Sequence, residues 1–366
     1  MGRAVVFANG VRERMLSESG GSEVLSELFE TFVDVSPFAK PWEWKSRYDD
    51  RVAGEHVLRL DTAEDARIFF DKRAFDYVLV VGLEWSEQRR ALVDAVSGSD
   101  WGILFVRGDM RDLSNGRRYD TQGILGLRQR LRHWQRRKKT TAKPPRHLFT
   151  NELGAFDFPE VTPQTDIIPV NHNDADSLYK AVAIDGPQVI AFLDQAVTHT
   201  FADNDSVAEE RFFDTQKAAA YHAAVNACLS DLSNKTGHPV AVCLHPNAPS
   251  AYAEAFDPAF RIVRGDTPGV LQNAALALTH NSMTTGFCHL LSVPTLLLDL
   301  GRDLTPKRLG ILTRRKARNE GLQILQWPGP LPDTVRRAGD ARVRQFLRPV
   351  PDGEDLAAVL RKHLID

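Results

Sequence analysis

The chain has 366 residues, more than a single hydrophobic core usually supports, so its length predicts two domains. Apolar residues make up 43% and charged residues 26%, which excludes a disordered chain, and a formal net charge of -2 argues against a protein whose whole surface binds nucleic acid. No apolar run approaches the roughly 20 residues that span a bilayer, and the N-terminal run is too short for a signal peptide.

The cysteines indicate the compartment. Cys228, Cys243 and Cys288 are scattered, form no CxxC pair and lie in apolar or helical contexts. This usage favours reduced structural thiols. We therefore expect a cytoplasmic protein, or one that is peripheral at the inner face of the membrane.

The first half of the chain alternates strand-like and helix-like patterns. β-branched and aromatic runs predict strands, and apolar residues at helical spacing predict the helices between them. The predicted elements are a strand over 4–10, a helix within 17–33 capped by Ser22, a strand over 75–85, a helix over 86–96 and a strand over 100–109. This half is therefore predicted to be α/β.

A second alternation begins near residue 186. Strands and helices that alternate on this scale imply another parallel sheet. The predicted elements are a strand over 187–195, a long helix over 208–237 closed by Gly237, strands over 238–246 and 259–265, a strand-loop-helix-strand unit over 276–301, a strand over 321–329 and a final helix over 352–366. Two α/β halves joined near 155–187 predict a cleft between the carboxyl ends of two sheets, where such folds bind ligands.

Three loops of the second half follow predicted strands. They are Asp194-Gln195, His245-Pro246 and the elbow from Thr279 to Gly286. Because carboxyl ends of parallel strands meet at one edge, we expect the loops to converge. Each also has a simpler interpretation, with Asp194 as a turn residue, His-Pro as a strand terminator and Ser282 as a helix cap.

The elbow THNSMTTG has the layout of a phosphate site. A helix N-terminus offers free backbone N–H groups and a favourable dipole for an anion. The hydroxyls of Ser282, Thr284 and Thr285 add neutral donors. We therefore expect a phosphate group at this loop.

The ordered set FLDQ, a long helix with Tyr221, LHPNAP, and a Ser/Thr-rich loop leading to SVPTLLLD resembles the donor-binding half of bacterial glycosyltransferases that use CMP-activated acidic sugars. These are the sialyltransferases, polysialyltransferases and Kdo transferases of lipopolysaccharide and capsule synthesis. The resemblance covers roughly residues 186–300, and no motif of the first 150 residues matches. It implies an α/β GT-B architecture of two Rossmann-like domains, with an acceptor-binding domain over 1–165, a nucleotide-sugar-binding domain over 186–335, and C-terminal helices over 336–366 that pack back across the domains.

The resemblance also implies roles for single residues. His245 would contact the phosphate of CMP and help its departure, with Pro246 fixing the backbone, because an imidazole can offset charge on the leaving group. Asn281, Ser282, Thr284 and Thr285 would bind the same phosphate. Neither a metal nor a cofactor is then expected, and the CMP-sugar is the donor substrate.

Asp194 would act as the catalytic carboxylate. Many of these sialyltransferases carry paired acids and a glycine here, whereas this chain has Gln195 and Ala196. A single carboxylate serves either as base in an inverting transfer or as nucleophile in a retaining one, so the stereochemistry stays open. The DxD-like triplets at 174–176 and 203–205 are interpreted as caps or solvated charges.

A basic segment over 128–147 carries nine Arg and Lys residues and no acid. It is interpreted as a solvated helix face, or as a patch for anionic phospholipid or a phosphorylated glycolipid acceptor, with Trp134 as an interfacial anchor. The two tryptophans within 41–51 suit either an acceptor loop or a small core. The expected partners are a nucleotide-sugar donor and a glycan or glycolipid acceptor, with no nucleic acid.

Two rival functions remain. One keeps the fold and uses a UDP-sugar, GDP-sugar or CDP-glycerol donor. The other is a noncatalytic anion- or nucleic-acid-binding protein that works through residues 128–147.

Overall fold

The computed structural model describes residues 2–8, 21–35, 57–82, 89–106, 142–151, 160–172, 175, 178, 181–200, 213–245, 248–282, 284–349 and 354–365. The chain divides into two compact units. The first unit comprises Met1–Asp176 and Gln345–Asp366, and the second unit comprises Ser177–Arg344. The sequence-based boundaries were set at residues 165, 186 and 335.

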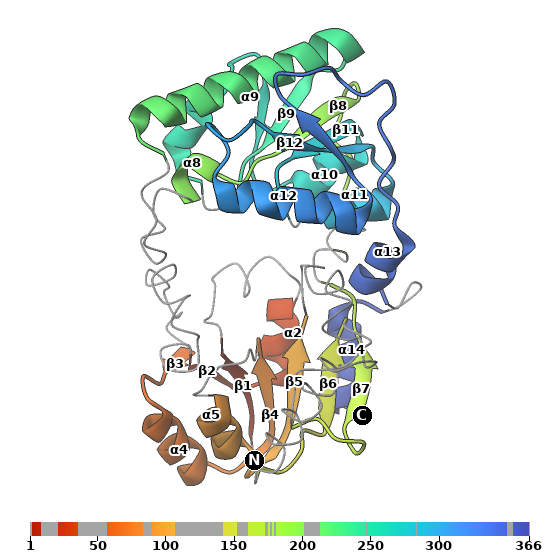
Figure 1. Ribbon diagram of the computed structural model, residues 1–366. Helices are drawn as coiled ribbons and strands as arrows, with labels where there is room; N and C mark the ends of the chain where they lie inside the picture. Colours follow the sequence, from red (N-terminus) through yellow and green to blue (C-terminus); the bar gives the residue numbers. More distant parts are fainter. Residues whose placement is uncertain are drawn as a thin grey trace, which may run out of the picture. The chain divides into compact units, whose positions relative to one another are not determined.

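The first unit is built on a seven-stranded parallel sheet in the order β3-β2-β1-β4-β5-β6-β7. Its strands are β1 (Gly2–Phe7), β2 (Thr31–Asp34), β3 (Val57–Arg59), β4 (Phe75–Val81), β5 (Asp100–Phe105), β6 (His147–Thr150) and β7 (Asp166–Pro169). Its helices are α2 (Gly21–Leu28), α4 (Ala63–Lys72), α5 (Arg89–Val96) and α14 (Leu356–Ile365), with α13 (Ala341–Leu347) at the boundary with the second unit (Figure 1).

Successive side chains of each strand point to opposite faces of this sheet, and helices pack on both faces. On one face Val6 packs with Phe70 of α4 and Leu92 of α5. On the other face, α2 and the C-terminal α14 pack together, and Arg361 of α14 pairs with Glu27 of α2 at 2.8 Å. The largely buried β1, β4 and β5 carry near-continuous apolar runs, which is the pattern that predicted them, whereas β2, β3, β6 and β7 were not predicted from the sequence.

The first predicted helix was too long. The helix predicted within 17–33 ends at Leu28, and Phe32 lies in β2, which pairs in parallel with β1. A short apolar run satisfies the helical and the strand periodicity alike, so local spacing could not separate the two. Pairing with β1 decides the outcome.

A glycine allows a side chain to cross the first sheet. The Tyr77 hydroxyl on β4 hydrogen-bonds to Nδ1 of His147 on β6 at 3.0 Å, although β5 runs between the two strands. A Cβ at Gly102 of β5 would lie 2.0 Å from that hydroxyl. Position 102 therefore needs a residue without a side chain.

The second unit contains a six-stranded parallel sheet in the order β10-β9-β8-β11-β12-β13. Its strands are β8 (Val189–Leu193), β9 (Val240–Cys243), β10 (Arg261–Val263), β11 (Ala274–Thr279), β12 (Thr295–Asp299) and β13 (Gln323–Gln326). Its helices are α8 (Val197–Thr200), α9 (Thr215–Thr236), the 3₁₀ helix η3 (Ser250–Ala255), α10 (Thr267–Gln272), α11 (Thr285–Leu291) and α12 (Lys307–Glu320) (Figure 1).

Capping residues set the limits of the long helix α9. Asp214 accepts a hydrogen bond from the Lys217 backbone at 2.7 Å, and Gly237 ends the helix in the left-handed conformation at φ 74°. The predicted end at Gly237 is thus correct, whereas the helix begins at Thr215 and not at 208. A side-chain N-cap and a glycine C-cap satisfy backbone groups that the helix itself leaves open.

Helices cover both faces of the second sheet. Val225 and Leu229 of α9 pack on one face, while Val270 of α10 and Phe287 of α11 pack on the other. The α12 helix packs beside β12 and β13. Two parallel sheets with helical layers confirm the predicted fold class, an α/β chain with two Rossmann-like domains.

The cysteines lie in these cores. Cys228, Cys243 and Cys288 are free and buried, as expected of structural thiols. Within the ranges that the structure describes, no helix is long and apolar enough to cross a membrane.

Candidate functional site

The loops that follow β8, β9 and β11 come together at one edge of the second sheet. From β8 the chain continues outward to β9 and β10 on one side, and from β11 it continues to β12 and β13 on the other side. The space between β8 and β11 is therefore the topological switch point of a doubly wound sheet. The Thr279 hydroxyl donates to the Leu193 carbonyl at 2.8 Å, and the Asn281 backbone donates to Oε1 of Gln195 at 2.7 Å. The predicted convergence of these loops is therefore observed.

Asp194 lies at the centre of this edge. Its side chain is buried, and Oδ2 accepts the backbone N–H groups of Ala196 at 3.0 Å and His245 at 3.4 Å. Oδ1 faces the Tyr252 hydroxyl at 3.5 Å. Burial raises the pKa of Asp194 to about 6, although these hydrogen bonds favour the ionised form. A carboxylate with this pKa can hold a proton transiently near neutral pH.

His245 and the elbow lie around Asp194. The partly buried His245 follows β9, and its backbone contact ties the β9 loop to Asp194. The backbone of Asn281 is already engaged by Gln195. Pro246 lies outside the described residues. The Gln195 side chain thus links the loops after β8 and β11.

The three predicted hydroxyl residues have different surroundings. Ser282 donates to Oγ1 of Thr284 at 2.8 Å and accepts the Thr284 backbone N–H at 3.1 Å, so these two form a compact turn. Thr284 is partly exposed, whereas Thr285 is fully buried. The Thr285 hydroxyl lies 3.1 Å from the Ser282 carbonyl and 3.2 Å from Glu320. Ser282 and Thr284 are therefore better placed than Thr285 to meet a ligand.

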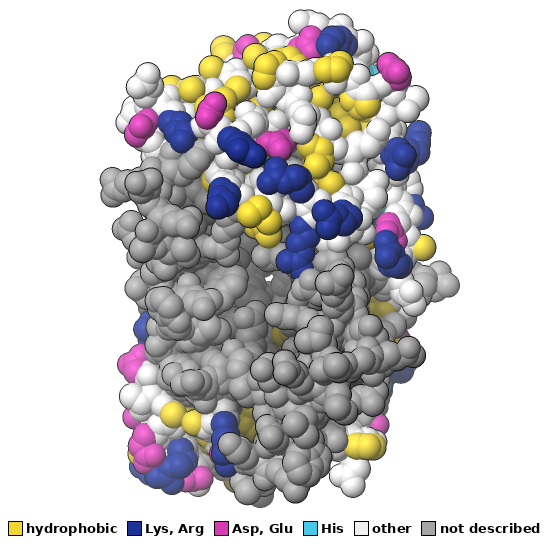
Figure 2. Space-filling view, in the orientation of Figure 1, with side chains coloured by type: hydrophobic (Ala, Val, Ile, Leu, Met, Phe, Trp, Pro, Cys, Tyr) yellow, Lys and Arg dark blue, Asp and Glu magenta, His cyan; other side chains and the backbone are white. Residues whose placement is uncertain are grey.

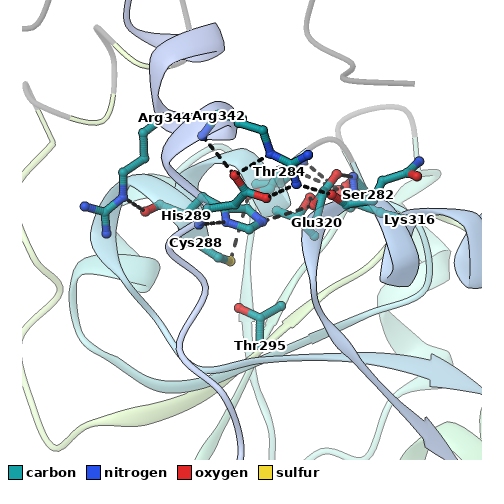
Figure 3. Close-up of polar contacts among 12 residues, drawn as sticks. Ser282, Thr284, Cys288, His289, Thr295, Lys316, Glu320, Arg342 and Arg344 are labelled. Carbon is teal, nitrogen blue, oxygen red and sulfur yellow. Dashed lines mark hydrogen bonds and ion pairs between the residues drawn. The ribbon is translucent and has the colours of Figure 1, made fainter. Parts of the chain in front are cut away.

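A buried polar cluster beneath the elbow supports this turn (Figure 3). Glu320 at the end of α12 contacts Nζ of Lys316 at 2.8 Å and Nε2 of His289 at 3.2 Å, besides Thr285. The Asp340 backbone donates to Nδ1 of His289, so Nε2 carries the proton given to Glu320. Burial opposes ionisation of Glu320, but the His289 hydrogen bond and the Lys316 charge outweigh it and lower its pKa. The cluster joins α11 to α12.

A second buried histidine follows β11 directly. His280 is fully buried; Nδ1 lies 2.7 Å from the Leu298 carbonyl and Nε2 lies 2.8 Å from the Tyr221 hydroxyl. A carbonyl can only accept, so Nδ1 carries the proton and Nε2 accepts from Tyr221. Burial lowers the pKa of His280 to about 4. This neutral pair anchors Tyr221 beneath the switch point, and it was not recognised from the sequence.

Positive charge flanks the end of β12. Arg314 of α12 lies 3.5 Å from Oδ2 of Asp299, the last residue of β12. Lys307 and Arg318 are exposed on the same helix, and Figure 2 shows Lys and Arg side chains gathered over this part of the second unit. Such a surface favours an anionic ligand near the carboxyl edge of the sheet.

Several predicted features fall largely outside the described residues. Of the basic segment, the structure describes 142–147, where Lys143 pairs with Asp100. The tryptophan loop within 41–51 and the triplet at 203–205 are outside, as are both acids of the triplet at 174–176. In the described part of the chain, no group of three His, Cys, Asp or Glu side chains is arranged to hold a metal ion.

Comparison with known proteins gives similarity of structure alone. No protein-family profile and no curated protein matches the chain. Among solved structures, UDP-GlcNAc 2-epimerase from Methanocaldococcus jannaschii is 12% identical, with a TM-score of 0.42, over 96% of this chain and 100% of that one. The glycosyltransferase SnogD from Streptomyces nogalater is 13% identical, with a TM-score of 0.43, over 95% and 96%. A UDP-glucosyltransferase from Polygonum tinctorium is 11% identical, with a TM-score of 0.44, over 100% and 98%. With TM-scores below 0.5, these similarities assign neither substrate nor activity.

Proposed function

We propose that the protein is a GT-B-type glycosyltransferase that moves an acidic sugar of the sialic acid or Kdo type from a CMP-activated donor to a glycan or glycolipid acceptor. The observation that carries the proposal is the meeting of Asp194, the His245 loop and the Ser/Thr elbow at the switch point of the second sheet. The choice of CMP and of an acidic sugar rests on the sequence motifs over residues 186–300.

The geometry supports a binding role for the elbow. Ser282 and Thr284 present two hydroxyls 2.8 Å apart on a turn held from below by Glu320 through Thr285. Because the Ser282 hydroxyl donates to Thr284, the Thr284 hydroxyl can donate its own proton to a phosphate group, and a neutral donor adds no fixed counter-charge that would bind all anions. We propose that Arg314, which lies close to Asp299, binds the carboxylate of the acidic sugar.

Asp194 is proposed as the general base. As the acceptor oxygen bonds to the anomeric carbon of the donor, the bond from that carbon to the CMP phosphate oxygen breaks. The proton of the acceptor hydroxyl passes to Asp194, and CMP leaves with its phosphate charge offset by His245 and the elbow hydroxyls. A carboxylate whose pKa is raised to about 6 is both ionised at neutral pH and basic enough for this task.

The test compares residues at opposite ends of the same two strands. Asp194→Asn and His245→Ala change the carboxyl ends of β8 and β9, whereas Asp185→Asn and His238→Ala lie before the amino ends of these strands. Release of CMP from CMP-sialic acid and CMP-Kdo should fall by about 100-fold or more in the first pair. The second pair should retain activity.

Two outcomes would contradict the proposal. Full activity of folded His245→Ala would remove the assigned role of the imidazole. Transfer from a UDP-sugar or GDP-sugar, without use of either CMP-sugar, would keep the reaction class and overturn the donor, whereas glycerol-phosphate transfer from CDP-glycerol would overturn the reaction class as well.

A further inference from the structure

A chain of hydroxyl and imidazole groups extends from Asp194 into the interior of the second unit. Tyr252 of η3 lies 3.5 Å from Oδ1 of Asp194. The backbone N–H and the hydroxyl of Thr198 in α8 are placed to donate to the Tyr252 oxygen. The Thr198 hydroxyl is 3.2 Å from Nε2 of His222 in α9. Four separate segments of the second unit therefore meet along one line of polar contacts.

The directions of these bonds can be assigned. Asp194 can only accept when ionised, so the Tyr252 proton points toward it. The Tyr252 oxygen then accepts from Thr198, whose own oxygen accepts the proton on Nε2 of His222. Each donor thus points toward the carboxylate, and bonds aligned in this way polarise one another.

His222 lies at the far end of this chain of contacts. The side chain is buried among Tyr221, Tyr252 and Phe256, and Nδ1 has no hydrogen-bond partner in the described structure. Burial lowers the pKa of His222 to about 4, so the ring is neutral. An unpaired buried nitrogen is costly, and it is retained here at the end of a chain that leads to the central carboxylate.

We propose that Tyr252 is a positioning residue for Asp194, and that Thr198 and His222 orient its hydroxyl proton toward the carboxylate. This inference deepens the proposed function, on which it rests for the catalytic role of Asp194. The Tyr252 hydrogen bond favours the ionised carboxylate and so partly offsets burial. It also holds Oδ1 at a fixed place while the backbone N–H groups hold Oδ2.

Other titratable groups act on the same carboxylate. Tyr221 of α9 and Cys243 at the end of β9 interact with its charge, and His245 donates its backbone N–H. Burial raises the pKa of the Cys243 thiol to about 12 and that of the Tyr221 phenol above its usual value, so both stay neutral across the range of interest. Tyr221 gives a matched control, because its hydroxyl is buried in the same unit but bonds to His280.

The experiment measures the titration of the Asp194 carboxyl by ¹³C NMR on protein labelled at aspartate, without donor or acceptor, with the resonance assigned by Asp194→Asn. Tyr252→Phe should move the midpoint up by about half a pH unit, the size expected for loss of one weak hydrogen bond. Tyr221→Phe should leave the midpoint in place even where it lowers the melting temperature. Thr198→Val, which keeps the tyrosine, should move the midpoint in the same direction by less.

An unchanged or lowered midpoint in Tyr252→Phe would overturn the inference. If Tyr252→Phe does not fold, an unchanged midpoint in Thr198→Val would do so. The result is separable from the proposed function. If Asp194→Asn kept full transfer activity while Tyr252→Phe still shifted the titration, the catalytic role would be wrong and the positioning contact would stand.

Discussion

Replacement of Asp194 by Asn should change how stability depends on pH. The folded-state pKa of Asp194 is about 6, above the value of about 3.9 for an unfolded chain. The folded protein therefore binds this proton more tightly. The stabilising contribution is fully present below the unfolded pKa and is lost as the pH rises through the folded pKa. Between about pH 5 and about pH 8 the loss of stability amounts to about 1.4 kcal/mol. At the lower pH the protonated form of the folded carboxyl outnumbers the ionised form by roughly ten to one, and a tenfold ratio corresponds to this free energy.

The assay is urea denaturation of wild type and Asp194→Asn at these two pH values. Between the lower and the higher pH, wild type should lose about 1.4 kcal/mol of unfolding free energy more than Asp194→Asn does. Subtraction between the two conditions cancels all other titrating groups and any constant loss of hydrogen bonds. Asp185→Asn, an exposed site, should show no such difference. A double difference near zero, or one that favours wild type at high pH, would refute the reasoning.

Further predictions concern packing, thiols and the elbow. Gly102→Ala should destabilise the first unit by about 1–3 kcal/mol through its clash with a tyrosine hydroxyl, whereas Gly98→Ala, which meets nothing within 4 Å, should change stability by less than about 0.5 kcal/mol in urea denaturation; equal effects would contradict this. Burial raises the pKa of all three cysteine thiols to about 12, so a colorimetric thiol reagent should react only after unfolding, and rapid labelling of native protein would be inconsistent with their placement. Thr284→Val should weaken CMP binding by calorimetry about tenfold with stability retained. Thr285→Val, which removes a donor from buried Glu320, should instead lower stability by about 1–3 kcal/mol, and the reverse pattern would contradict the assigned roles.

Much of the second unit could be predicted because its strands are short apolar runs with polar residues immediately after them. VIAFL directly precedes Asp194, VAVC is followed by Leu244 and then His245, and ALALT ends in the first residue of the elbow; parallel pairing brings these strand ends to one edge. The same logic could not fix the end of α2, because Phe32 fits a helical and a strand pattern equally. Sheet pairing with a distant segment made that choice.

The supporting contacts of the site could not be read from spacing. Glu320 meets His289 across 31 positions of sequence, and Tyr252 meets Asp194 across 58. The helix that carries Glu320 is dominated by Arg and Lys, so its few apolar positions gave little signal. Gln195 looked like a departure from a motif, and only its contact with Asn281 shows it joining two loops.

The central claim is that the switch point of the second sheet binds CMP. The most direct measurement is a melting curve of the whole protein with CMP, compared with UMP, GDP and buffer, with EDTA present throughout. CMP near 100 times its dissociation constant should stabilise the folded protein by about 2.7 kcal/mol, and Thr284→Val should reduce the shift. A shift with UMP or GDP but not CMP, or no shift with any nucleotide, would contradict the claim.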